Sequence, residues 1–304
     1  MKILITGGAG YKGVKLVAKL LKHGHKVTIL DNFMYGFEPI LHLVENIDLT
    51  VKKQDIRNKI EDIKNYDSIF HLAGISGLPA CAANPSSAQL INVEATKQLV
   101  GSLSKNQILI YASTTSFYGK TGEKCTEETL VDPVSYYGKT KYEAEQIISE
   151  RENSICLRFA TVFGFSPKMR MDLMVNDFTY KALKEGVVVL FDSFAKRTFI
   201  HIDDAVECYV FALDNFDRMR GGIYNAGGDN LNFSKFEITK AIQKHIKFQI
   251  VESEVKDKDL RHFLVSYEKI KALGYTPKKS LDDGIVQMLK IFSFYDYFTH
   301  YRVI

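Results

Sequence analysis

Thr6-Gly7-Gly8-Ala9-Gly10-Tyr11-Lys12-Gly13 lies between a short apolar run, Ile3 to Thr6, and an amphipathic helical pattern, Gly13 to His23. Its glycines match both the G-x-G-x-x-G and the G-x-x-G-x-x-G spacing. Without side chains, the backbone turns tightly and approaches a pyrophosphate, which then lies at the positive end of the following helix. A glycine-rich turn needed only for packing is the structural alternative. The order strand, glycine loop, helix predicts a dinucleotide-binding unit.

Alternating strand and helix patterns continue through the first half of the chain. Short runs rich in Ile, Val, Leu and Phe are typical of strands that are buried on both faces. Their alternation with amphipathic helices predicts βαβ units and a right-handed parallel sheet. The expected strands are Ile3 to Thr6, Lys26 to Leu30, Leu49 to Lys52, Ser68 to Leu72, Ile108 to Ala112 and Ile155 to Phe159. The expected helices are Gly13 to His23, Ala88 to Ser104 and Tyr136 to Arg151.

An acidic residue follows the second expected strand. Asp31 stands at the offset where a carboxylate accepts hydrogen bonds from both hydroxyls of an adenosine ribose. A carboxylate there repels a 2′-phosphate, which favours NAD over NADP. Asp55-Ile56-Arg57 ends the next strand and either frames the adenine or contains a helix-capping Asp. Lys12 replaces a usually apolar residue, so its side chain either extends outward or neutralises phosphate.

The pattern after Gly164 is looser and predicts a smaller lobe. It contains an expected strand, Val187 to Phe191, and the expected helices Met171 to Glu185, one capped by Asp203 or Asp204, and one after Leu281. The predicted fold class is α/β, a Rossmann-type doubly wound parallel sheet with a smaller mixed α/β substrate lobe. We expect an NAD-binding domain at 1–165, with 197–225 returning to it. The substrate lobe is expected at 166–196 and 226–304, with a second ligand in the shared cleft.

Composition restricts the classes of function. The net charge of +4 over 304 residues, without a long Lys/Arg block, argues against nucleic acid as a partner but allows local phosphate pockets. The four cysteines are scattered, which predicts reduced thiols and no metal or disulfide framework: Cys81, Cys125, Cys156 and Cys208. No stretch has the length of a signal segment or membrane span, so we expect a cytoplasmic protein without a membrane partner.

A hydroxyl-rich strand end and a later helix carry the candidate catalytic groups. Thr114 ends the expected fifth strand, and Tyr137 and Lys141 lie four residues apart, on one face of the expected helix. A phenol with a pKa of about 10 is a poor base at neutral pH. An adjacent ammonium and a cationic nicotinamide ring favour the phenolate. The alternative is an exposed ion-pair spacing, which is common on helices.

In combination, these motifs resemble those of the extended short-chain dehydrogenase/reductases and, more narrowly, the NAD-dependent sugar-nucleotide epimerase/dehydratase family. The resemblance covers nearly the whole chain. It implies that Tyr137 exchanges the proton of the reacting hydroxyl, that Lys141 holds the nicotinamide ribose, and that Thr114 hydrogen-bonds the same sugar oxygen. The motifs that carry it are Gly7-x-x-Gly10-x-x-Gly13, Asp31, Asp55-Ile56-Arg57, His71-Leu72-Ala73-Gly74, Asn92-Val93, Thr114 and Tyr137-x-x-x-Lys141.

The resemblance also implies two sets of binding residues. Cofactor contacts are expected from Gly7, Gly10, Tyr11, Lys12, Gly13, Asp31, Asn32, Asp55, Ile56, Leu72, Ala73, Gly74, Asn92, Ala112, Ser113, Tyr137, Lys141, Phe159 and Val162. Substrate contacts are expected from Ser76, Thr114, Thr115, Thr161, Asp172, Leu173, Val189, Phe191, Arg197, Asp259 and Arg261. The two arginines suit a diphosphate, and a surface salt bridge is the alternative for each. His201, Asp203 and Asp204 are expected to be structural.

Departures from the family narrow the reaction. Sugar 4,6-dehydratases and nucleotide-sugar decarboxylases carry an acidic residue after the catalytic Thr, where this chain has Thr115 and Ser116. Neither hydroxyl is a competent acid or base at neutral pH, so simple redox at C4 is expected. Ser76 stands where hexose 4-epimerases carry a Lys, and Thr161 replaces their Asn. The segments Phe159 to Phe165 and Met169 to Leu173 resemble those of enzymes that modify sugars of bacterial surface polysaccharides.

Three functions remain open from sequence. The first choice is a GDP-heptose 4-dehydrogenase of capsule polysaccharide biosynthesis, and the alternative is a UDP-hexose 4-epimerase. A non-enzymatic protein of this fold that senses a dinucleotide or binds RNA is the third, although such proteins typically lose the Tyr or the Lys that this chain keeps. The helices 88–104 and 136–151 predict a homodimer, in which Leu90, Val93 and Val100 either form the interface or face the sheet.

Overall fold

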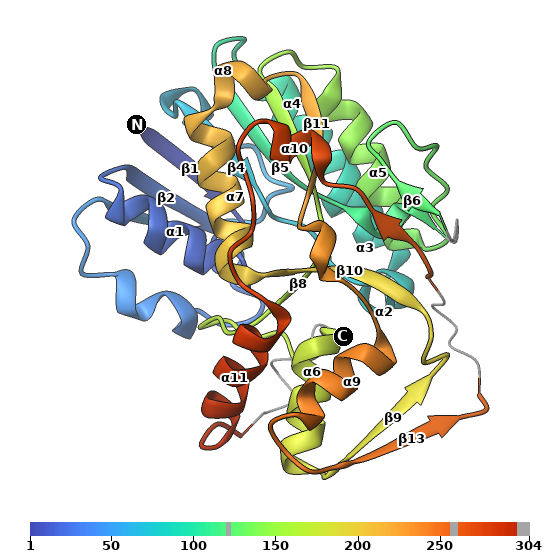
Figure 1. Cartoon of the computed structure of the whole chain (residues 1–304). Helices are drawn as coiled ribbons and strands as arrows, with labels where there is room; N and C mark the ends of the chain where they lie inside the picture. The colour runs from blue at the N-terminus through green and yellow to red at the C-terminus, as the bar shows by residue number, and fades with distance from the viewer. Residues whose placement is uncertain (120–122, 256–260, 297–304) are drawn as a thin grey trace.

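A computed structural model describes residues 1–119, 123–255 and 261–296. Seven parallel strands form its large sheet in the spatial order β11-β7-β5-β4-β1-β2-β3 (Figure 1). This order reverses between β1 and β4, and the predicted Rossmann-type α/β fold is confirmed. The strands are β1 (Lys2–Thr6), β2 (Lys26–Asp31), β3 (Leu49–Lys53), β4 (Ser68–His71), β5 (Ile108–Thr114), β7 (Ser154–Phe159) and β11 (Gly222–Ala226).

Helices cover both faces of this sheet. One face packs against α1 (Gly13–Lys22) and α7 (Ile202–Asp214), and the other against α4 (Ala95–Ser102) and α5 (Tyr136–Ser149). Ile3 and Ile5 of β1 enter the first apolar core, whereas Leu4 enters the second. Because successive strand residues point to opposite faces and both faces are covered, β1 is apolar throughout its buried length.

A smaller group of elements has its own apolar core, which contains Phe178, Phe199, Ile238 and Met288. It consists of α6 (Met174–Lys184), α9 (Lys235–Gln243), α11 (Leu281–Phe292) and the parallel pair β9 (Val187–Phe191) and β13 (Gln249–Ser253). In Figure 1 these elements lie together at one end of the large sheet. Between the two groups runs a three-stranded sheet of β8 (Thr161–Phe163), β10 (Lys196–His201) and β12 (Asn232–Ser234).

Short elements complete the described chain. The helical ones are α2 (Leu78–Ala83), α3 (Pro85–Gln89), α8 (Phe216–Met219), α10 (Glu268–Ala272) and the 3₁₀ turns Glu38–Leu43, Ile63–Asn65, Thr115–Tyr118 and Asp229–Leu231. The strands β6 (Lys124–Cys125) and β14 (Leu264–Val265) form a parallel pair. The positions proposed as boundaries between the two lobes stay a prediction.

Two expected helices are present but differ from the prediction in detail. The expected helix from Ala88 to Ser104 is divided by a π-helical turn, Leu90–Glu94. That turn directs the amide of Asn92 to Ile75, whose N–H and carbonyl lie 2.8 and 3.0 Å from it. The helix expected to be capped by Asp203 or Asp204 begins at Ile202, and His201 caps it, because its Nδ1 accepts the N–H of Asp203 at 3.2 Å.

The two acids instead connect elements. Asp203 forms an ion pair with Lys15 of α1. Asp204 accepts the backbone N–H groups of Lys278 and Lys279 at 3.0 and 2.8 Å.

All four cysteines are free and buried, in agreement with the prediction of unpaired thiols. Among the described residues, no helix is both long enough and apolar enough to span a membrane. The same residues contain no group of three or more His, Cys, Asp or Glu side chains that could hold a metal ion.

Candidate active site

The glycine loop connects the carboxyl end of β1 to the start of α1. Gly7 has a φ of +72°, and a Cβ there would lie 2.7 Å from the amide nitrogen of Ala73. A Cβ on Gly13 would lie 2.3 Å from the carbonyl oxygen of Gly7, so neither position accepts a side chain without a shift of the backbone. Gly7, Gly10 and Gly13 all border one large pocket. A bare backbone at a helix N-terminus is suited to hold a diphosphate.

Asp31 ends β2 beside this loop. Its carboxylate accepts the N–H of Ala9 at 3.1 Å and the N–H of Phe33 at 2.9 Å, one on each oxygen. Burial raises the pKa of this carboxyl, and the hydrogen bonds from Phe33 and Ala9 act in the opposite direction. A carboxylate has about four acceptor positions, so capacity remains for the two hydroxyls of a ribose. Together, the glycine loop and Asp31 fit the adenosine diphosphate portion of NAD.

The large pocket has a volume of about 420 Å³. It lies where the carboxyl ends of β1, β4, β5 and β7 face the smaller group of elements. Most of the residues predicted to bind cofactor or substrate border it: Gly7, Gly10, Tyr11, Lys12, Gly13, Leu72, Gly74, Ser76, Ala112, Ser113, Thr114, Tyr137, Lys141, Phe159, Thr161, Val162, Asp172, Leu173, Arg197 and Arg261.

Tyr137 and Lys141 lie in the first turns of α5. Ser135 caps this helix by accepting the N–H of Gly138 at 3.0 Å, and this cap sets the direction from which both side chains enter the pocket. The ammonium of Lys141 lies 4.0 Å from the centroid of the Tyr111 ring. Burial lowers the pKa of Lys141 to about 7, although the nearby carboxylate of Glu145 acts to raise it.

Thr114 and Ser116 form a hydroxyl pair at the end of β5. The Thr114 hydroxyl donates to Ser116 Oγ at 3.0 Å and accepts the N–H of Ser116 at 3.1 Å. Thr115 departs from the prediction that it contacts substrate, because its hydroxyl donates to the carbonyl of Phe159 at 3.2 Å and does not border the pocket. In the 3₁₀ turn that begins here, Ser116 borders the pocket in place of Thr115, and Ser116 was not among the residues predicted from the sequence.

Arg170 is a second residue that sequence reasoning missed. Its guanidinium donates to Ser76 Oγ at 3.0 Å and to both oxygens of Asp172 at 3.1 and 2.5 Å. It thereby joins the loop after β4 to the segment before α6, with Lys168 close by on the same border of the pocket. The segment Met169 to Leu173 resembles one of sugar-modifying enzymes, but the contact of its Arg170 with Ser76 is long-range and could not be predicted from a local sequence pattern.

Several predicted contacts lie away from the large pocket. Asp55 forms a bidentate pair with Arg57, and the amide of Asn92 serves the loop at Ile75. Val189 and Phe191 lie on β9, where they are 43% and 39% exposed. The others that do not border the pocket are Asp31, Asn32, Ile56 and Ala73. Asp259 lies outside the described residues.

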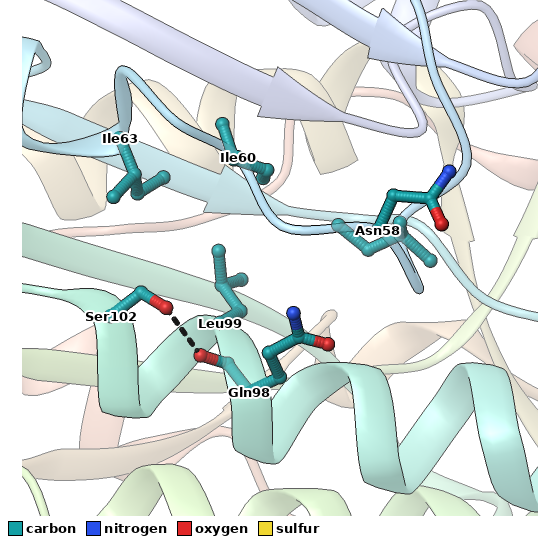
Figure 2. Close-up of a pocket in the computed structure, with 7 residues that line it drawn as sticks. Asn58, Ile60, Ile63, Gln98, Leu99 and Ser102 are labelled. Atoms are coloured by element: carbon teal, nitrogen blue, oxygen red, sulfur yellow. Dashed lines mark hydrogen bonds between the residues drawn. The ribbon is translucent and has the colours of Figure 1, made fainter.

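Ile56 borders a separate, small cavity of about 10 Å³ (Figure 2). Ile60, Ile63 and Leu99 point toward one another across it, and the amide of Gln98 lies at its edge. A cavity needs about 10–15 Å³ and several polar partners to hold one water molecule. This gap between α4 and the segment after β3 is therefore a packing feature and too small for an adenine ring.

The comparison with known proteins agrees with this geometry. Residues 3–227 match the NAD-dependent epimerase/dehydratase family. The chain belongs to this family. Its members are NAD-dependent enzymes of sugar-nucleotide chemistry, so the predictions of an enzyme and of NAD as its cofactor are confirmed.

Individual members of the family match nearly the whole chain. CDP-paratose 2-epimerase of Salmonella typhi is 30% identical over 95% of this chain and 98% of that protein. UDP-glucuronate 4-epimerase 4 of Arabidopsis thaliana is 27% identical over 95% of this chain and 74% of its own. The structure of UDP-glucuronic acid 4-epimerase from Bacillus cereus in complex with UDP-glucuronic acid and NAD has a TM-score of 0.83 and 26% identity, covering 96% and 99% of the two chains.

Proposed function

We propose that this family member performs NAD-dependent redox chemistry at C4 of a nucleotide-diphosphate sugar. The observation that carries the proposal is the convergence of Tyr137, Lys141 and Thr114 on the pocket that the glycine loop also borders. Arg197 and Arg261 border the same pocket, and their guanidinium groups suit the diphosphate of a sugar nucleotide. One cavity thus holds groups for cofactor binding, proton transfer and substrate binding.

Each group has a defined task in this proposal. The glycine loop and Asp31 hold the cofactor, and bound NAD supplies the hydride acceptor. Tyr137 removes the proton of the C4 hydroxyl, to which Thr114 donates or from which it accepts a hydrogen bond. Lys141 holds the nicotinamide ribose and stabilises the phenolate by its charge.

The two residues that follow Thr114 favour redox at C4 without elimination of water or carbon dioxide. In the dehydratases and decarboxylases that this chain resembles, an acidic residue follows the catalytic Thr and serves the removal of water or carbon dioxide after oxidation at C4. Thr115 is turned to the Phe159 carbonyl, and Ser116 presents only a hydroxyl to the pocket. A serine or threonine hydroxyl does not exchange protons at neutral pH without an activating base. This chemistry favours an epimerase or a dehydrogenase over a dehydratase or decarboxylase.

The finer substrate assignment has two forms. A UDP-hexose 4-epimerase is favoured by the Arabidopsis and Bacillus relatives, which by name are 4-epimerases of a UDP-linked sugar. A GDP-heptose 4-dehydrogenase of capsule polysaccharide biosynthesis is favoured by Ser76 and Thr161, which depart from the hexose 4-epimerase pattern and both border the pocket. Either form places the protein in the cytoplasm, where nucleotide sugars are made.

The mass of the sugar nucleotide distinguishes these forms. The enzyme is incubated with NAD and UDP- or GDP-linked hexoses and heptoses. A product lighter by two hydrogens, together with reduced nicotinamide, identifies a dehydrogenase; an unchanged mass with a new chromatographic peak identifies an epimerase. Loss of water contradicts the interpretation of Ser116. Tyr137→Phe is the matched variant. It should lower the turnover rate by about 10²-fold or more, while NAD still binds.

A further inference from the structure

Lys12 places an ammonium inside the cofactor pocket. It is the residue before α1, and its Nζ lies 4.2 Å from the centroid of the Phe159 ring and 5.5 Å from that of Tyr209. Within residues 1–119, 123–255 and 261–296, its side chain makes no ion pair or hydrogen bond. Aromatic faces therefore contact this ammonium on one side. On the other side it borders the pocket that holds Tyr137 and Lys141.

The charged groups around Lys12 are themselves cationic. Lys141 of α5 and Arg170, from the segment before α6, both repel it. The other titratable neighbours are the thiol of Cys208 and the phenol of Tyr209, both on α7, and burial raises the pKa of that phenol. Burial and these two cations lower the pKa of Lys12 to about 7. The thiol stays protonated because burial raises its pKa above the usual range. The pocket is therefore a place where an additional positive charge is strongly disfavoured.

We infer that Lys12 makes this pocket discriminate between the two oxidation states of its cofactor, favouring NADH over NAD⁺. The nicotinamide ring carries a positive charge when oxidised and none when reduced. An ammonium in the same low-dielectric pocket repels the first and not the second. The usual apolar residue at this position would exert no such bias. The inference rests on the proposed cofactor site and adds an electrostatic preference to it.

A diphosphate contact is the competing interpretation of Lys12, and it makes a different prediction. NAD⁺ and NADH carry the same diphosphate, so an ammonium that bound it would strengthen the binding of both forms equally. The quantity that separates the interpretations is the preference ratio, which is the Kd of NAD⁺ divided by the Kd of NADH. If Lys12 contacts the diphosphate, its replacement leaves this ratio unchanged. If Lys12 repels the oxidised ring, the ratio is high in the wild type and falls when Lys12 is replaced by an uncharged residue.

The experiment measures both dissociation constants by titration calorimetry, without sugar nucleotide, for the wild type, Lys12→Met and Lys12→Arg at pH 6. Lys12→Met keeps the side-chain length and removes the charge; it should lower the preference ratio about tenfold, since a nearby like charge shifts such equilibria by at least that factor. Lys12→Arg keeps the charge and should keep most of the preference. Lys15→Met is the matched control, because Lys15 pairs with Asp203 outside the pocket, and should leave the ratio unchanged.

The pH dependence of the preference ratio provides a second test. Lys12 is charged below its pKa and neutral above it, so the ratios of the wild type and Lys12→Met should differ at pH 6 and converge at pH 9. Equal weakening of both cofactors in Lys12→Met overturns the inference in favour of a diphosphate contact. An unchanged ratio with unchanged affinities overturns it as well. If the wild type binds neither cofactor, the proposed site and the inference fall together.

Discussion

At the scale of single residues, positive charge distinguishes the pocket. Among the described residues that border it, Asp172 is the one acid, against the bases Lys12, Lys141, Lys168, Arg170, Arg197 and Arg261. Two diphosphates, one from the cofactor and one from the sugar nucleotide, would balance most of this charge. Much of the binding free energy is then electrostatic, and added salt should weaken the binding of both ligands.

Asp31 provides a prediction about cofactor choice. Asp31→Asn removes the negative charge that opposes a 2′-phosphate, and it weakens acceptance of hydrogen bonds from the ribose. The Kd of NAD should rise about tenfold. NADP, which we expect the wild type to bind poorly, should bind more tightly. Calorimetric titration with both cofactors measures this. Glu45→Gln, at an exposed position that does not border the pocket, should change neither value. Unaltered NADP binding in Asp31→Asn would contradict the assignment.

The part of the site that sequence predicts well is the part fixed by local spacing. The glycine loop and the Tyr137–Lys141 pair depend on residues within one or two turns, and both border the pocket. Thr115 was misplaced because a single 3₁₀ turn decides which of two neighbouring hydroxyls faces inward. Arg170 was missed because its partner Ser76 is distant in the chain. The inward direction of Lys12 likewise depends on aromatic rings from β7 and α7.

At the scale of elements, α5 connects the catalytic pair to the sheet. Glu145 lies one turn beyond Lys141 and is fully buried. Its carboxylate accepts the hydroxyl of Ser113 at 2.6 Å and pairs with the guanidinium of Arg158 at 2.7 Å. Arg158 in turn donates to the hydroxyl of Tyr118 at 2.8 Å. This network ties the helix to the carboxyl ends of β5 and β7, where the reactive groups stand.

Removing one partner of the Glu145–Arg158 ion pair should destabilise the fold more than removing both partners. Glu145→Leu leaves a buried guanidinium without its partner, and we expect the free energy of unfolding to fall by about 3–5 kcal/mol. The double variant Glu145→Leu with Arg158→Met removes both charges and should recover part of that loss. Urea denaturation of the two single variants and the double variant measures the coupling. A double variant that loses the sum of both single effects would show that the pair is not a unit.

The strands were predicted to within about two residues because continuous apolar runs mark buried parallel strands. The π-helical turn at Leu90–Glu94 was not predicted, since it depends on the contact of Asn92 with the loop at Ile75. The cap of α7 was assigned to an Asp by residue preference, but both acids are engaged with other elements and His201 takes that position. Tertiary contacts decided both cases.

At the scale of the whole molecule, the two buried lysines should make stability depend on pH. Lys12 and Lys141 have pKa values of about 7 in the folded protein, against 10.5 for an ordinary lysine. Between these values the unfolded chain binds more protons than the folded one, so the stability of the ligand-free protein should rise as the pH increases from about 7 to 10. Below pH 7 both states are charged and this contribution is constant.

Thermal unfolding at several pH values tests this expectation. The Tm of the ligand-free wild type should increase above pH 7, and Lys12→Met should show a smaller increase. At pH 7 and below, Lys12→Met should be the more stable protein, because it no longer buries an ammonium without a counter-charge. Lys15→Met, which alters a lysine of α1 outside the pocket, should keep the wild-type dependence. A Tm that falls over this range in both proteins would contradict the burial of these charges.

The homodimer predicted from sequence has a direct test. Of the three residues named for its interface, Leu90 is 47% exposed and Val93 is buried, whereas Val100, on α4, is partly buried against the second apolar core of the large sheet. Leu90→Glu should therefore convert a dimer to a monomer with an intact fold, since a charge in a paired apolar face is costly. Light scattering after gel filtration gives the mass. A wild type with the mass of one chain would refute the dimer.

The core that packs α6, β9, α9, β13 and α11 is drawn from stretches of chain on both sides of β10, α7 and β11. β11 is also the edge strand of the large sheet. A gene segment that carried this core to a relative would therefore carry an edge strand of the large sheet with it. Natural recombination and engineered chimaeras alike meet this obstacle, so new sugar specificities in such a chain should arise by stepwise replacement of pocket residues and not by cassette exchange.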